Sequence, residues 1–240
     1  MTLQSGPTGA GSIDDHELFY ARRSLKRFRA RRGRQGLLDL LAADIDEGNA
    51  FLRESAIASD GRFTPGTTVL TARGLTSGEF LAWMDKAFAA DESALLDAPP
   101  EHYVMAPEAN GSFNVGENIG PHVCSFFMGG WGTDAMAWAV EADGLLPQAE
   151  SPHKMSSHLF LSDGTVVGRA LTQFGDAADG FTAHLTVYVP EACPREVLEH
   201  ASGLYTVRLD VNPSSVSPNW ISTRPTTVPS DRRRAPTAPH

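Results

Sequence analysis

The dipeptide Asp163-Gly164 constrains the fold more than any other feature, because it separates two stretches in which apolar and polar residues alternate. Asp-Gly in this setting is typical of a two-residue β-hairpin turn. Such a turn fixes the register, so that Phe160 lies opposite Val167 and His158 lies opposite Arg169. The sequence therefore predicts two antiparallel strands at 155–161 and 165–174.

A third strand is predicted at 181–189, paired through Phe174 and Phe181. Because opposed residues share a face of a sheet, one face becomes almost wholly apolar and must be covered, whereas the other can meet water. The small residues Gly168 and Ala170 leave room above the covered face. That face collects Met155, Leu159, Leu161, Val166, Ala170, Phe174, Phe181, Ala183, Leu185, Val187 and Val189.

The remaining body supplies further strands at 67–73, 103–106, 112–117 and 122–128. Thr76 and Glu79 have the spacing of a capping box, which predicts a helix that begins there. A short second helix is expected at 92–98, a helical turn at 134–142, and a final helix after Pro194. The fold class is α+β, with a curved antiparallel sheet of about six to seven strands packed on helices.

Four zones divide the chain: a flexible leader (1–13), a basic helical appendage (14–59), a pocket domain (62–211), and a disordered tail rich in Pro and Arg (212–240). Eight basic residues fall between Arg22 and Arg34, and no acidic residue occurs between Leu18 and Leu38. Gly33 and Gly36 break this helix, and Gly48 ends a second, amphipathic one. The basic helix predicts an anionic partner (nucleic acid, anionic lipid or an acidic protein) or docking on the chain's own acidic body.

Charge and cysteine content narrow the class of protein. With 20 basic and 29 acidic side chains the net charge is -9, which disfavours a generalised nucleic-acid coat. The two cysteines exclude a disulfide scaffold and suit a reducing compartment, and no apolar run is long enough for a membrane helix. We therefore expect a soluble, cytoplasmic protein. No phosphate loop or dinucleotide motif occurs, and Arg169 beside His158 disfavours a metal, so no cofactor and no metal are expected.

The order of elements (strand, two helices, six strands, helix) resembles the helix-grip fold of the START-like superfamily, which includes lipid-transfer proteins and polyketide aromatase/cyclases. The resemblance covers about residues 67–210 and lies in element order alone. It implies a cavity for an apolar ligand between a curved sheet and a C-terminal helix. The helices followed by the Tyr103 strand also resemble the opening of ketosteroid-isomerase-like cone folds.

Within such a pocket Glu117 is the first catalytic candidate, because it continues an apolar alternation and could act as acid or base. The alternative, which the position of Glu117 at the end of its strand favours, is that its carboxylate simply reaches water. His122, across Gly120-Pro121, is its expected partner. Tyr103 and His102 could also point into a pocket mouth, but nothing in the sequence selects them. The expected ligand is a polyketide, aromatic or lipid-like molecule, and the expected enzyme, if any, is a cofactor-independent cyclase, dehydratase or hydrolase. The alternative is an interaction module that uses the basic helix. The ligand-binding candidates are Tyr103, Phe113, Val115, Phe127, Leu159, Ala170 and Leu185.

Overall fold

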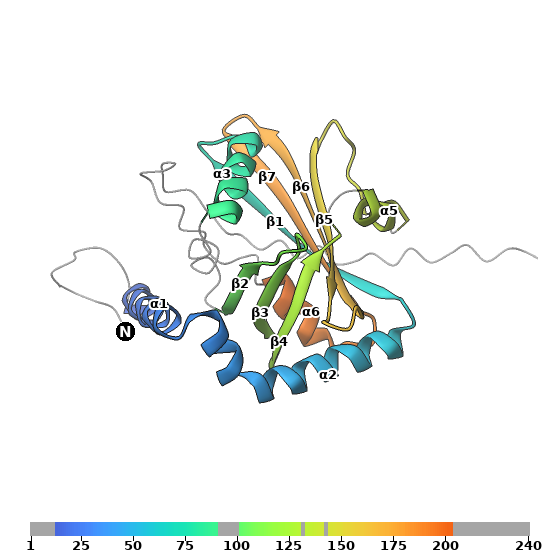
Figure 1. The fold of residues 1–240 in the computed structure, drawn as a ribbon. Helices are drawn as coiled ribbons and strands as arrows, with labels where there is room; N and C mark the ends of the chain where they lie inside the picture. Colours follow the sequence, from blue (N-terminus) through green and yellow to red (C-terminus); the bar gives the residue numbers. More distant parts are fainter. Residues whose placement is uncertain (1–12, 91–100, 131–132, 142–143, 204–240) are drawn as a thin grey trace, which may run out of the picture.

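The computed structural model describes residues 13–90, 101–130, 133–141 and 144–203. It shows an α+β fold built on one seven-stranded antiparallel sheet, in the order β1-β7-β6-β5-β4-β3-β2 (Figure 1). The predicted fold class is confirmed. The strands are β1 (Phe63–Arg73), β2 (His102–Pro107), β3 (Phe113–Ile119), β4 (His122–Gly129), β5 (His153–Phe160), β6 (Val166–Ala177) and β7 (Gly180–Pro190).

Helices lie before, within and after the sheet. Thr76 and Glu79 form the predicted capping box: the Thr76 backbone N–H donates to the Glu79 carboxylate at 2.7 Å, and the Glu79 N–H donates to the Thr76 hydroxyl at 3.2 Å. The helix predicted at 92–98, residues 1–12 of the predicted leader (1–13) and the segment 204–240 lie outside the described residues. The helices are α1 (Ile13–Leu40), α2 (Ala42–Ser59), α3 (Ser77–Ala90), α5 (Thr133–Glu141) and α6 (Arg195–Gly203).

The first predicted hairpin keeps its register along most of its length, since His158 lies opposite Arg169. Its turn differs from the prediction. The Leu161 N–H donates to the Thr165 carbonyl at 2.9 Å, which closes a loop of three residues. Gly164 has a φ of 84° there, and a left-handed glycine is typical of such three-residue loops.

A β-bulge compensates for the longer turn. Phe160 lies opposite Val166, so the predicted pairing of Phe160 with Val167 is wrong. The bulge also exchanges the roles of the two valines: Val167 is 4% exposed and belongs to the core, whereas Val166 is 37% exposed. Val166 therefore does not belong to the covered face, because the extra residue reverses the alternation locally.

The second hairpin is shifted by two residues from its predicted register. Phe174 lies opposite Ala183 rather than Phe181, because the strands continue to a tight turn between Ala177 and Gly180. A shift of two preserves the side-chain alternation, whereas a shift of one would invert it. The apolar face predicted for these strands is thus retained, with Phe174, Phe181 and Ala183 buried together against α3.

The opposite face of the sheet does not simply meet water, contrary to the prediction. Leu171, Gln173 and Tyr188 are buried on it. Trp138 of α5 packs edge-on against Tyr188, with ring centroids 4.8 Å apart. The Gln173 side chain accepts a hydrogen bond from the backbone at 146 and donates one to the carbonyl at 144, which holds this segment over the sheet.

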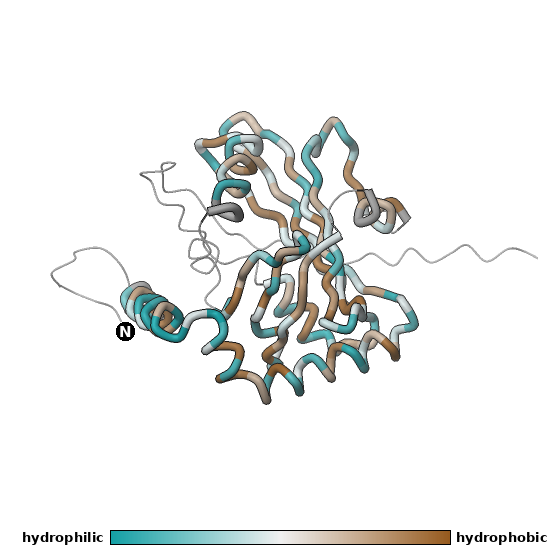
Figure 2. Tube along the Cα trace, viewed as in Figure 1, coloured by the Kyte–Doolittle hydropathy of each residue, from teal (hydrophilic) through white to brown (hydrophobic). Residues whose placement is uncertain are grey.

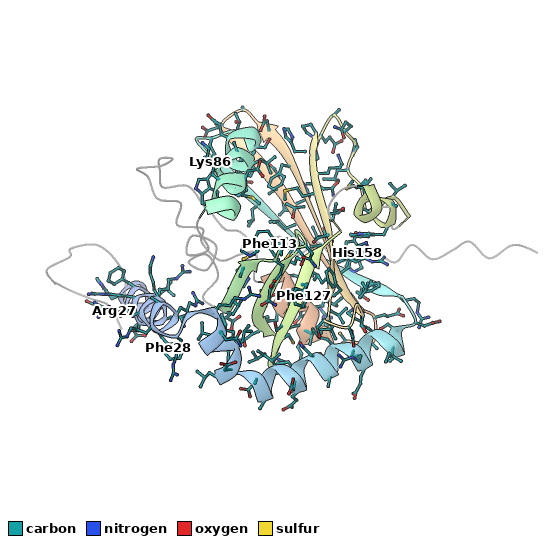
Figure 3. All side chains as sticks on the ribbon, in the orientation of Figure 1. Arg27, Phe28, Lys86, Phe113, Phe127 and His158 are labelled. Carbon is teal, nitrogen blue, oxygen red and sulfur yellow. The ribbon has the colours of Figure 1, made fainter. Side chains whose placement is uncertain are left out.

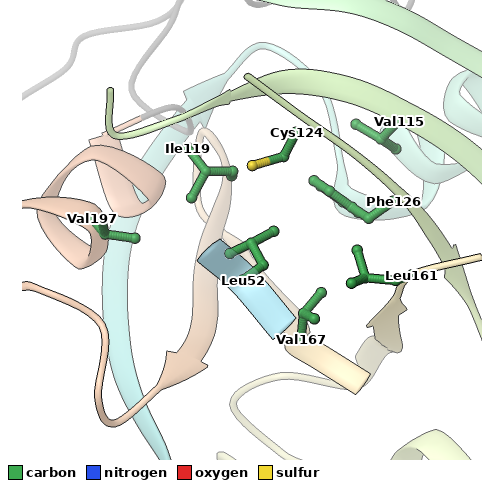
Figure 4. Packing of buried hydrophobic residues seen from close by; sticks show 8 residues of the cluster. All are labelled: Leu52, Val115, Ile119, Cys124, Phe126, Leu161, Val167 and Val197. Carbon is green, nitrogen blue, oxygen red and sulfur yellow. The ribbon is translucent and has the colours of Figure 1, made fainter. Parts of the chain in front are cut away.

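Helix α2 is part of the core. Gly48 does not end the helix as predicted; it lies where the helix meets β4, and a Cβ there would stand 2.1 Å from the Val123 carbonyl oxygen. One turn later Leu52 is buried among apolar residues of β3, β4 and β6 (Figure 4). Along α2 hydrophobic and hydrophilic residues alternate (Figure 2), as a helix that packs on one side requires.

Candidate functional site

A cavity of about 170 Å³ lies inside the curve of the sheet. Strands β2 to β7 supply most of its lining, and Leu52 of α2 and Ala201 of α6 contribute from the helices. On β6 the lining residues include Gly168 and Ala170, whose small side chains leave room for the cavity. Its lining is apolar except at three residues, His102, Glu117 and Tyr188.

The polar end of the cavity is a histidine–carboxylate pair. The Nε2 atom of His102 lies 2.6 Å from Oε2 of Glu117, and their side chains are 13% and 9% exposed. Tyr188 packs its ring against Trp138, on the other side of the sheet. His102 and Glu117 are therefore the polar side chains that the cavity offers to a ligand.

The two ring nitrogens of His102 have different surroundings. The Nδ1 atom of His102 is buried and has no hydrogen-bond partner among the described residues. A second N–H at that atom would be a buried donor without an acceptor, which costs about 1–3 kcal/mol. Nε2 is therefore the ring nitrogen that faces the Glu117 carboxylate as a donor. The contact with His102 is made by Oε2 of Glu117.

A β-bulge in β2 creates this pairing. The strand pairs with β3 so that Val104 lies opposite Gly116, but the register then shifts by one residue and places His102 opposite Glu117. Tyr103 is the additional residue. It packs with Leu37 of α1 instead of facing the cavity.

A second pair joins the same strand end to α6. Oε2 of Glu101 lies 3.0 Å from Nε2 of His200, and the Asn118 amide donates to Glu101 at 3.2 Å. Because Glu101 precedes His102, these contacts fix the start of β2 against the helix that contributes Ala201 to the cavity wall. The contact between Glu101 and His200 therefore holds the residue next to His102 in place.

The predicted ligand-binding residues divide into two groups. Val115, Leu159 and Ala170 line the cavity. The other four are not in its walls: Tyr103 lies in the bulge, Phe127 stacks on Phe160 with centroids 5.9 Å apart, Leu185 packs in the Phe80 cluster beneath α3, and Phe113 is half-buried further along β3.

Of the predicted catalytic pair, Glu117 lines the cavity and His122 does not. The histidine in contact with Glu117 is His102. His122 stacks on Phe51 of α2, with ring centroids 4.1 Å apart and an interplanar angle of 19°. His102 was among the residues that could point into a pocket mouth, but the sequence contains no local signal for the bulge that brings His102 to Glu117.

A buried thiol lies directly across from the carboxylate, since Cys124 is opposite Glu117 in the β3–β4 pairing. Burial, followed by the negative charge of Glu117, raises the pKa of Cys124 to about 12. A thiolate is the nucleophilic form of cysteine. Cys124 is therefore an inert thiol of the core next to the site, and the His102–Glu117 pair is left as the group suited to proton transfer.

Other site classes find no support in the described part of the chain. No group of three or more His, Cys, Asp and Glu side chains is arranged there to hold a metal ion. None of the described helices combines the length and apolar character needed to span a membrane.

No protein-family profile matches the sequence, and no curated protein matches it significantly. The antiparallel sheet with helices after β1 and after β7 is compatible with a helix-grip-like fold.

Proposed function

We propose that this chain binds a small apolar molecule in the cavity and that Glu117, oriented by His102, transfers a proton to or from it. The observation that carries the proposal is the 2.6 Å pair between His102 and Glu117 at the end of an otherwise apolar cavity. An apolar pocket with a few convergent polar groups is the usual form of a ligand site. This arrangement supports a divergent helix-grip protein as the class of molecule.

The cavity volume limits the ligand. A cavity of about 150 Å³ in another protein binds benzene, whereas pockets for drug-sized molecules enclose about 300–1,000 Å³. At about 170 Å³, this cavity suits a single ring or a short acyl chain with one hydrogen-bonding group. Among the expected ligand classes, a monocyclic aromatic or short lipid-like compound therefore fits better than a multi-ring polyketide.

The acid–base step follows from the two carboxylate oxygens. Oε2 is held by the His102 N–H, and Oε1 accepts a proton from an acidic C–H or O–H of the ligand. In a cyclisation or dehydration, Glu117 then returns the same proton to the oxygen that becomes a hydroxyl or leaves as water. Such a positioned base contributes about 10²–10⁴-fold to a rate. This step favours a cyclase or dehydratase over a hydrolase, because a hydrolase must also admit a water molecule beside the ligand.

Binding is tested by native mass spectrometry of the purified chain, followed by solvent extraction of the bound material and a thermal-shift screen of monocyclic aromatics and short acyl compounds. Ala170→Leu fills the cavity and should abolish binding. Ala58→Leu makes the same change at an exposed position of α2 and should leave binding intact. Binding that Ala170→Leu leaves unchanged, or no binding in either assay, contradicts the proposal.

Proton transfer is tested on the molecule so identified. In D₂O the chain should exchange an acidic hydrogen of that molecule for deuterium, as followed by NMR. Glu117→Gln preserves the shape of the side chain and should slow the exchange by about 100-fold or more. His122→Gln is the matched control and should exchange at the normal rate. Equal rates for both variants would remove Glu117 from the chemistry while leaving the binding proposal intact.

A further inference from the structure

The basic part of α1 presents arginines and aromatic rings together on its exposed side. The rings are well exposed, at 58% for Phe19, 60% for Tyr20 and 41% for Phe28. Figure 3 shows Arg27 and Phe28 on α1 away from the sheet. The exposed arginines of this segment are Arg23, Arg27, Arg31 and Arg32.

The charge of this helix is opposite to that of the rest of the chain. Eight basic residues and no acidic residue occur between Leu18 and Leu38, which leaves twelve basic against twenty-nine acidic side chains elsewhere. The end of α1 is fixed to the body, because Leu37 packs on β2 and Arg34 pairs with Glu108. Gly33 interrupts the helix with a φ of 65°, and α1 stands apart from the sheet in Figure 1.

We propose that this segment binds single-stranded nucleic acid. Arginine forks bind phosphate oxygens in a bidentate way, and exposed aromatic rings stack on unpaired bases. Arg23, Arg27 and Arg31 recur every four residues and so lie along one side of the helix, over a rise of about 12 Å. Phe19 and Phe28 lie at its two flanks, so a strand following the arginines meets a ring on either side.

The same observations disfavour the other anionic partners. A helix that enters a membrane surface needs a continuous apolar face. On α1 the less exposed side carries Arg22 and Arg29 beside Leu25, so it is not a continuous apolar face, and Arg27 lies near the middle of the exposed side. An acidic protein would use the arginines but would leave the three exposed rings without a role. Reading a duplex requires a groove-binding motif, and the sequence contains none.

Fluorescence anisotropy of the full chain with a fluorescein-labelled 20-nucleotide oligouridine tests the proposal across a salt series. Four arginine–phosphate contacts predict a slope of log K against log salt of about -3. Arg27→Gln with Arg31→Gln should reduce that slope to about -1.4, because two contacts are lost. Phe19→Leu and Phe28→Leu should each weaken binding by about fivefold or more at constant slope, and Phe28→Trp should restore it.

The control is Arg73→Gln with Arg195→Gln, which removes two arginines whose side chains are 70% and 89% exposed on the body. This variant should bind as the wild type does. Vesicles of phosphatidylcholine with 30% phosphatidylserine provide the competing surface. The proposal is overturned if the two double variants bind oligouridine equally, or if α1-dependent binding to the vesicles is the tighter of the two. Because no cavity residue is changed, the outcome is independent of the proposed ligand site.

Discussion

The His102–Glu117 pair should reduce, rather than increase, the stability of the fold relative to an apolar pair. His102→Leu leaves a carboxylate that is 9% exposed without its donor, which should cost about 3–5 kcal/mol. Glu117→Leu leaves one buried N–H unsatisfied and should cost about 1–3 kcal/mol. The double variant removes both polar groups, and replacing such a pair with apolar residues is neutral or stabilising by about 1–4 kcal/mol.

Unfolding by urea and by heat, each followed by circular dichroism, measures this cycle. His102→Leu should lower the melting temperature by about 6–20 °C, whereas the double variant should melt at or above the wild-type temperature. His122→Leu is the control, because His122 stacks on Phe51 and the structure gives it no contact with Glu117. Its effect should add to that of Glu117→Leu. A double variant as unstable as the sum of its parts would refute the reasoning, since it would show that the two side chains do not interact.

Three further outcomes follow from burial and charge. Leu52→Ala should destabilise the chain by about 2–5 kcal/mol in urea unfolding, because Leu52 is 4% exposed, whereas Leu40→Ala at a 51% exposed position should change stability by about 0.5 kcal/mol or less. Cys124 should resist iodoacetamide at pH 8 until the chain unfolds, because burial raises the pKa of its thiol to about 12. Hydrogen bonds from Thr165 lower the pKa of Asp163 to about 2. Asp163→Asn should therefore be less stable than wild type in urea at neutral pH, and the difference should vanish as pH falls through about 4 towards 2.

Local signals predicted where the two hairpins lie, but not the length of the first loop or the register of the second hairpin, because such signals act over only a few residues. Asp163-Gly164 sets a turn, and the alternation that follows sets which side of the strand is buried. The signal does not specify whether the loop contains two or three residues. The three-residue loop therefore displaced Val166 from the core in favour of Val167, while the pairing of His158 with Arg169 survived beyond the bulge.

The candidate site depends on the β-bulge in β2, for which the sequence contains no local signal. Had β2 paired regularly with β3, continuing from Val104 opposite Gly116, Tyr103 would lie opposite Glu117, and this is the side chain that the sequence placed in the pocket. The bulge inserts Tyr103 as an extra residue and brings His102 to Glu117 instead. Leu37, far away in the sequence, packs against the displaced ring. Because β-bulges often re-aim side chains at functional sites, deleting Tyr103 is a direct test of the bulge. The regular ladder that results keeps Val104 opposite Gly116 and His102 opposite Glu117, but without the extra residue. Loss of deuterium exchange on the bound molecule, in a deletion variant that still folds stably, would show that the bulge itself positions His102 and Glu117. Unchanged exchange would show that a histidine opposite Glu117 is sufficient.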